Sequence, residues 1–461
     1  MNKENIDLGK GKIGKLLLTL AVPTIIGQLV NLLYNIIDRI FIGKMASGDL
    51  AMAGVGVAMP IILLVSAFAM LIGAGGAPLT AIEMGKQNND KAEEIMSNCF
   101  SIIILIGIFL TIVFSVFKEP ILWAFGASNA TIGYGLDYLS IYLIGTIFVQ
   151  ISLGMNSFIN TQGFTKIGMT TVIIGAIINI VLDPILIFGF NMGVKGAALA
   201  TMIAQFVSAI FVLIFLFGKK SILKIRKKYL KINKKLAIAI LSLGVAPFIM
   251  QSTESLVLVS LNNQLLKYGG DLAVGAMTIM SSIMQVLIMP LMGLTQGAQP
   301  IISYNFGARE MDRVKKTFKL LFVVCLSYSA IMVLLIMLFP EFFVSIFNNK
   351  PELVEITSWA MRIYFIGMSL FGAQMACQQT LLALGQAKIS LIIALLRKIV
   401  LLVPLIFILP IFIEDGLTAV FLAEPVADII AILTTVIIFA IFYRKTFKNT
   451  NKSEKEVENT L

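Results

Sequence analysis

One short stretch of the sequence places an amide, a carboxylate and a proline inside an otherwise apolar run. In NIVLDPILIFGF, Asn179 and Asp183 are four residues apart, so a helix would carry both side chains on one face. Pro184 has no backbone N–H and would leave the carbonyl of Ile180 without its helical partner. Inside a membrane that carbonyl needs another donor or an ion. These oxygens together would suit Na⁺ or a proton.

A second interpretation of the same stretch is that Asp183 caps a new helix beginning at Pro184. Few apolar residues follow the proline, which favours a kink at Pro184 within one helix.

Seven further ionisable residues lie inside apolar runs, where each costs about 2.5–3.5 kcal/mol even on the lenient insertion scale. They are Arg39, Lys398, and the site candidates Asp38, Glu254, Arg397, Glu424 and Asp428. Asp38 is either an ion site or an interfacial charge that snorkels toward water. Its neighbour Arg39 points to another helical face, so an ion pair between the two is a poor explanation.

Glu254 lies in a polar stretch, APFIMQSTESLVLVS, that also carries Gln251 and Ser255. A helix with so many polar faces should line water or protein rather than lipid. Glu254, Gln251 and Ser255 are therefore candidates for a substrate cavity, where Glu254 would meet a cationic substrate or hold a second coupling ion. The alternative is a structural hydrogen bond from Glu254 to a Ser or Thr of another helix.

Arg397, Glu424 and Asp428 are expected to form a structural ion-pair group. Glu424 and Asp428 are four residues apart and share a helical face. Arg397 lies in the preceding apolar run, which would be antiparallel to theirs. Pairing makes buried charges tolerable, so we predict a structural role ahead of a transport role.

The elements that position these residues are membrane spans. The chain has 461 residues, of which 58% are hydrophobic and only 13% charged. Its apolar runs are long and continuous, which indicates spanning helices rather than a β-barrel. Twelve spans are predicted, near 16–42, 51–77, 96–117, 132–160, 167–190, 194–217, 237–264, 272–297, 317–339, 356–384, 389–411 and 417–442.

The basic residues predict the orientation. Alternate loops and both termini hold most of the 36 Lys and Arg residues, and residues 218–236 are the most basic loop. The loops on the other side hold one each: Lys44, Lys118, Lys195, Lys267 and Lys350. Both termini should then be cytoplasmic in a multi-pass protein of the cell membrane. Loop 218–236 would lie against anionic lipid headgroups, which explains the net charge of +11 without nucleic acid.

An internal repeat divides the chain. GDLA at 48–51 recurs at 270–273, and the same spacing of 222 residues joins further landmarks. These are Gly75 and Gly297, Pro78 and Pro300, Gly85 and Gly307, Asp90 and Asp312, Gly163 and Gly385, and Lys166 and Lys388. Two six-span lobes of equal orientation, 1–217 and 237–461 with its cytoplasmic tail, are predicted on either side of the linker 218–236. Parallel repeats of this kind are typical of secondary transporters.

The remaining composition removes several chemistries. The chain has no histidine, so His-based metal sites and His bases are excluded. The three cysteines lie in or beside apolar spans with no metal or disulfide spacing. No Walker A motif and no cleavable signal segment are apparent. An enzyme embedded in the membrane is therefore the least favoured function, and no cofactor is expected.

Together these features resemble the MATE (multidrug and toxic compound extrusion) family, in particular its MepA-like branch. The resemblance covers nearly the whole chain and rests on LYNIIDRIFIG, GDLAMAGVG, QGFTKIG, NIVLDPILIFG, GVKGAALAT, APFIMQSTESLV and LLRKIVLLVPL. It implies two six-helix lobes around a central cleft and export of drugs and organic cations in exchange for Na⁺ or H⁺. A lipid-linked precursor flippase of the same superfamily is the alternative.

The resemblance also implies a cation-coupling network. Its members would be Asp38, Asn156, Asn179, Asp183 and Thr201, which match the family's residue types at matching spacing. Some relatives use a Glu in span seven with an Asp in span ten. Glu254 is near the first position, but span ten contains no acidic residue here, so that pairing is in doubt. We expect an antiporter that works by alternating access as a monomer, with Na⁺ at Asp38 and Asp183 as the one possible metal ion.

Overall fold

The computed structural model describes residues 7–45, 47–348 and 350–458, and helices are the regular elements throughout these ranges. The few terminal residues of the expected N-terminal lobe and tail, 1–6 and 459–461, lie outside the described part.

The elements, in chain order, are α1 (Ile13–Gly43), α2 (Gly48–Gly85), α3 (Asn89–Ala124), α4 (Ile132–Ile144), α5 (Thr146–Gln150), η1 (Ile151–Met155), α6 (Asn156–Thr161), α7 (Thr165–Pro184), η2 (Ile185–Gly189), α8 (Val194–Phe217), η3 (Lys227–Tyr229), α9 (Lys234–Gly307), α10 (Met311–Leu338), α11 (Pro340–Ser345), α12 (Pro351–Tyr364), η4 (Gly367–Leu370), α13 (Phe371–Ala383), α14 (Ala387–Leu395), η5 (Leu396–Leu402), α15 (Val403–Phe412) and α16 (Gly416–Glu458).

These elements include most of the predicted spans. Within the described ranges, nine helices are individually long and apolar enough to cross a membrane, and α4 with α5–α6 adds a span bent by 61°. The 74-residue α9 contains two spans, because Gly270 interrupts it at φ 63°, a backbone conformation that favours glycine. The predicted span 356–384 corresponds to α12, η4 and α13, and its crossing of the membrane stays a prediction. The expected all-α polytopic fold is confirmed.

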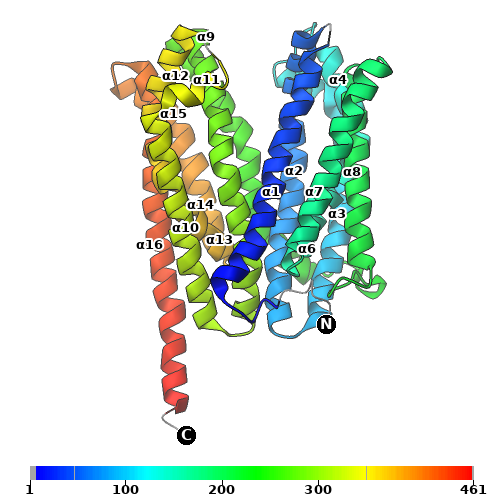
Figure 1. Cartoon of the computed structure of the whole chain (residues 1–461), viewed down its shortest axis with the longest axis vertical. Coiled ribbons are helices and arrows are strands. Elements are labelled where there is room, and N and C mark those ends of the chain that lie inside the picture. The colour runs from blue at the N-terminus through cyan, green and yellow to red at the C-terminus, as the bar shows by residue number, and fades with distance from the viewer. Residues whose placement is uncertain (1–6, 46, 349, 459–461) are drawn as a thin grey trace.

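Figure 1 shows these helices as roughly parallel rods, with both ends of the drawn chain toward one end of the bundle. We call this the basic end, because it carries the loop after α2, the segment 218–233 and the loop before α10. The long α16 extends beyond the other helices there (Figure 1).

The hydrophobic core shows how the two halves of the chain meet. One cluster is built mainly from residues 257–427, yet Leu16, Leu17 and Leu20 of α1 belong to it. A second cluster lies mainly within residues 71–225, yet it includes Ile240 of α9. The first parts of α1 and α9 therefore each pack against the opposite half of the chain. Sequence analysis placed each whole span in its own half and missed this exchange.

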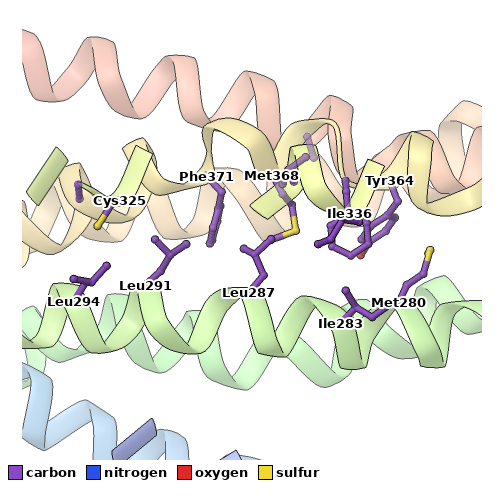
Figure 2. Packing of buried hydrophobic residues seen from close by; sticks show 14 of the residues in the cluster. Met280, Ile283, Leu287, Leu291, Leu294, Cys325, Ile336, Tyr364, Met368 and Phe371 are labelled. Atoms are coloured by element: carbon purple, nitrogen blue, oxygen red, sulfur yellow. The ribbon is translucent and has the colours of Figure 1, made fainter. Parts of the chain in front are cut away.

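Figure 2 shows the interior of the larger cluster. Met280, Ile283, Leu287, Leu291 and Leu294 follow one face of α9 at helical spacing and point toward the neighbouring helices. Cys325, Ile336, Tyr364, Met368 and Phe371 meet them from α10 and the α12–α13 region (Figure 2). All three cysteines of the chain are free and buried, in keeping with their interpretation as small apolar side chains.

The basic segment 218–233 is tied to α3 rather than lying only against lipid. The backbone N–H of Lys224 and the Arg226 Nε donate to the two carboxylate oxygens of Glu93, both at 2.9 Å. The N–H of Asn233 donates to Asn98 Oδ1 at 2.7 Å. Glu93 and Asn98 are buried. Sequence analysis assigned lipid headgroups to this segment and no partner within the protein.

Candidate ion and substrate sites

π-Helical turns occur at three of the predicted positions. Such turns wind more loosely than α-helix, are rare, and often mark functional sites. Within the described ranges, η1 directly precedes Asn156, η2 directly follows Pro184, and η5 contains Arg397 and Lys398. The backbone stays helical through Pro184 and widens after it. A bend at this proline stays a prediction.

The first candidate site lies between α1, α7 and α8. Asn179 Nδ2 donates to Asp183 Oδ1 and to Thr201 Oγ1, both at 3.3 Å. The side chains of Asn179 and Asp183 are buried. The other oxygens of these groups, Asn179 Oδ1 and Asp183 Oδ2, are buried and have no hydrogen-bond partner among the residues that the structure describes. Such oxygens are suited to receive an added proton or cation.

Asp38 joins this group through its carboxyl. The side chains of Asp38 and Asp183 are close neighbours, and Asp38 Oδ1 is another buried oxygen without a hydrogen-bond partner among the described residues. Two carboxylates this close cannot both stay ionised in a low dielectric without a shared proton or a cation between them. Arg39 is exposed, with its guanidinium 3.9 Å from the sulfur of Met59.

Asn156 is not part of this hydrogen-bonded group. Its Nδ2 donates to the backbone carbonyl of Gly168, at 3.3 Å, near the start of α7. Its Oδ1 is buried and has no partner within the described protein. The structure thus links Asp38, Asn179, Asp183 and Thr201 side chain to side chain and places Asn156 on the α7 backbone instead.

A tyrosine pair adds to the first site. The Tyr138 side chain lies near the Thr201 hydroxyl and the Asp38 carboxyl. Its ring stacks on Tyr142, with centroids 6.0 Å apart and planes 20° apart. Sequence analysis missed Tyr138. Its four-residue spacing from Tyr142 in the fourth span was the available signal, since it puts two hydroxyl-bearing rings on one face.

The second candidate site is a buried ionic cluster in the second half of the chain. Arg397 Nε lies 2.7 Å from Asp428 Oδ1, and Arg397 Nη2 lies 3.3 Å from Glu424 Oε1. The guanidinium also stacks over the Phe371 ring, 4.6 Å from its centroid. Each of the three charged side chains is buried. The remaining oxygens, Glu424 Oε2 and Asp428 Oδ2, have no hydrogen-bond partner within the described part of the chain.

Glu254 is bound to Lys398 in an ion pair. Both side chains line one cavity of about 50 Å³, together with Tyr364, Arg397 and Glu424. Sequence analysis singled out Glu254 and gave it no cationic partner. Gln251 and Ser255 are partly buried on the same helix and are not among the residues lining this cavity.

Neither site is built like a centre for a multivalent metal. Within the described ranges, no group of three or more Cys, Asp or Glu side chains converges as metal ligands would. The chemistry available is the binding of a proton, a monovalent cation or a cationic organic group.

Long apolar helices that carry buried carboxylates, in a chain whose sequence repeats itself at a spacing of 222 residues, define a polytopic membrane protein of the secondary-transporter class. The model of the MatE family matches residues 23–185 and 245–408. The chain therefore belongs to the MATE family, and it is a transporter rather than an enzyme.

Individual relatives are similar to this chain over nearly its full length. The multidrug export protein MepA of Staphylococcus haemolyticus is 27% identical over 97% of this chain and 98% of its own. MepA of Staphylococcus aureus is 26% identical over 93% of this chain and 94% of its own length. A crystal structure of MATE in the bent conformation has a TM-score of 0.91 at 21% identity, covering 98% of this chain and all of that one.

Proposed function

We propose that this transporter is a multidrug efflux antiporter that exports amphipathic, often cationic compounds in exchange for H⁺ or Na⁺. The observation that carries the proposal is the pair Asp38 and Asp183. Their carboxyl groups are close neighbours inside apolar helices, and each has one buried oxygen without a hydrogen-bond partner among the described residues. The names of the staphylococcal relatives, multidrug export proteins, support the substrate class.

The proposed cycle alternates access to a cleft between two lobes, residues 1–217 and 237–461, joined by the linker 218–236. The basic end would face the cytoplasm, together with both termini. An ion binding at Asp38 and Asp183 changes the charge beside η2, and it shifts the equilibrium because it binds one state more tightly than the other. Expulsion of the drug and uptake of the ion are then linked through this shift.

The test is ethidium efflux from proteoliposomes under separately imposed Na⁺ and pH gradients. Asp183→Asn should abolish gradient-driven efflux while the protein still folds. Asp137→Asn is the matched control, because Asp137 is half exposed and only pairs with Lys195 at 3.4 Å. Full efflux by Asp183→Asn would refute the assigned ion site.

A lipid-linked precursor flippase is the alternative function. Such a protein would need a basic cavity to hold a diphosphate, and the cavity here sets Glu254 and Glu424 against Arg397 and Lys398. Asp428 adds a third carboxylate beside Arg397. The predominance of carboxylates favours a cationic substrate. Movement of a labelled lipid diphosphate, with no drug efflux, would support the flippase instead.

A further inference from the structure

Glu254, Lys398 and Glu424 form an exchangeable ion-pair system. We propose that Glu254 receives the cationic group of a substrate, and that the Lys398 ammonium is its internal competitor, moving between Glu254 and Glu424. This inference rests on the proposed drug-export function and assigns the residues that select cationic substrates.

The exposures of the paired side chains differ in the way this role requires. The Glu254 side chain is 46% exposed, whereas that of Lys398 is 9% exposed. Within the ion pair, the Glu254 carboxylate is therefore more accessible than the Lys398 ammonium. Because Lys398 already occupies Glu254, a substrate can bind there only if Lys398 leaves.

The charge of the cluster gives Lys398 a second place to bind. Three carboxylates, Glu254, Glu424 and Asp428, face only two cations, Arg397 and Lys398. Arg397 engages one oxygen of Glu424 and one of Asp428, which leaves Glu424 Oε2 buried and unpartnered. An unpaired carboxylate oxygen in the interior attracts a cation strongly. Glu424 Oε2 can therefore bind either the Lys398 ammonium or a proton.

The surroundings allow Lys398 to move and hold Arg397 in place. Residues 254, 398 and 424 line the same cavity of about 50 Å³, enough for water and a shifting ammonium but too small for a drug. Lysine is a flexible point charge. Arg397 is fixed by two carboxylates and by the Phe371 ring. Arg397 and Lys398 are consecutive residues of the π-helical η5, and both are buried, each residue as a whole being 7% exposed.

These features define an exchange cycle. With Glu424 ionised, Lys398 pairs with Glu424 and leaves Glu254 free for a cationic substrate. When Glu424 takes a proton from water, Lys398 returns to Glu254 and displaces the substrate. Besides Lys398, the groups that face Glu424 are Arg397, Asp428, Glu254 and Tyr364, and none of them needs to change protonation.

The experiment measures equilibrium binding to the purified full-length transporter of ethidium, a monocation, and Nile red, a neutral amphipathic dye, between pH 5.5 and 8.5. Lys398→Met should tighten ethidium binding about tenfold or more and remove its pH dependence. Nile red binding should not change. Lys388→Met, which removes an exposed charge at the start of α14, is the control.

Two further variants keep the test decisive if Lys398→Met folds poorly. Glu424→Gln imitates the protonated state and should weaken ethidium binding at every pH. Lys398→Met with Glu424→Gln keeps the net charge of the wild-type cluster and should bind ethidium tightly. The inference is overturned if these variants leave ethidium affinity unchanged, or shift both dyes equally. Failure of the wild type to bind or export either dye would instead overturn the proposed function.

Discussion

Gly85 of α2 and Gly307 of α9 allow the two helices to meet backbone to backbone at the basic end. A Cβ on Gly85 would lie 1.9 Å from the Tyr304 carbonyl oxygen, and a Cβ on Gly307 would lie 2.0 Å from that of Ile82. Both glycines and both carbonyl residues are 222 positions apart in sequence. The internal repeat thus appears as a nearly symmetric contact, and only glycine fits on either side.

Gly307→Ala should therefore weaken closure of the basic end. A methyl group there meets backbone rather than a mobile side chain, so the helices must separate. Spin labels at Asp90 and Asp312, two exposed positions, should report a larger population of long distances by pulsed electron resonance. Gly56→Ala is the control, since nothing lies within 4 Å of its added Cβ. Identical distance distributions for the variant and the wild type would contradict this role.

With Na⁺ as the coupling ion, Asn179→Ala should weaken its binding. The variant loses Asn179 Oδ1, a buried oxygen without a hydrogen-bond partner among the described residues, together with the amide that joins Asp183 to Thr201. An interaction of this kind with a charged group contributes about 1.5–3 kcal/mol, so the Na⁺ concentration for half-maximal efflux should rise roughly 10- to 160-fold. The control is Thr170→Ala, which removes a hydroxyl that bonds only the backbone of α7. Equal ion dependence in both variants would remove Asn179 from the site.

Tyr138→Phe should weaken binding of the coupling ion less than Asn179→Ala does. The ring stays stacked on Tyr142, but the hydroxyl beside Thr201 is removed. A neutral hydrogen bond contributes about 0.5–1.5 kcal/mol, which predicts a roughly 2- to 12-fold loss in apparent ion affinity. Thermal stability should stay close to wild type. Tyr268→Phe, at an exposed ring, serves for comparison. A variant that loses stability but keeps its ion affinity would assign Tyr138 to packing alone.

The sequence could predict contacts that depend on periodicity within one span. Asn179 with Asp183, and Glu424 with Asp428, follow from four-residue spacing on a helix. The pair Lys398 and Glu254 could not be predicted in this way, because it joins residues 144 positions apart. It also depends on the π-helix η5, which turns two consecutive basic residues inward. No periodicity rule for an α-helix gives that geometry.

The sequence also could not predict that the first parts of α1 and α9 pack against the opposite half of the chain. Apolar periodicity shows that Leu16, Leu20 and Ile240 are buried, but every span of this chain is apolar on most faces. Burial against the near half and burial against the far half therefore give the same sequence pattern. The glycines repeated in the two halves carried a signal of close helix contact: a Cβ on Gly75 would lie 2.2 Å from the Ile240 carbonyl oxygen in α9, and one on Gly297 would lie 2.5 Å from Ala21 Cα in α1.

Arg397→Met should destabilise the protein strongly. It leaves Glu424 and Asp428 buried without their cation, and loss of one partner from a buried pair costs about 3–5 kcal/mol. The melting temperature in detergent should fall accordingly. Arg397→Met combined with Glu424→Gln and Asp428→Asn removes all three charges and should recover most of the loss. A single variant as stable as wild type would show that this cluster does not support the fold.

Glu93→Gln should release the basic segment from α3. Glu93 accepts from the Lys224 backbone N–H and from Arg226, and its side chain is only 8% exposed. The neutral amide keeps the size of the group but weakens both charge-assisted bonds. Trypsin should therefore cut within residues 218–233 several times faster, as followed by gel electrophoresis of the detergent-solubilised protein.

Asp90→Asn provides the matched control for this release. Asp90 also pairs with a basic residue of the segment, Lys228 at 3.5 Å, but both side chains are well exposed, at 79% and 60%. Exposed pairs contribute about 0–1 kcal/mol, so cleavage should stay near the wild-type rate. If both variants are cut equally fast, the segment is held by its backbone and apolar contacts. If only Glu93→Gln is cut faster, the buried carboxylate of Glu93 holds the basic segment 218–233 against α3.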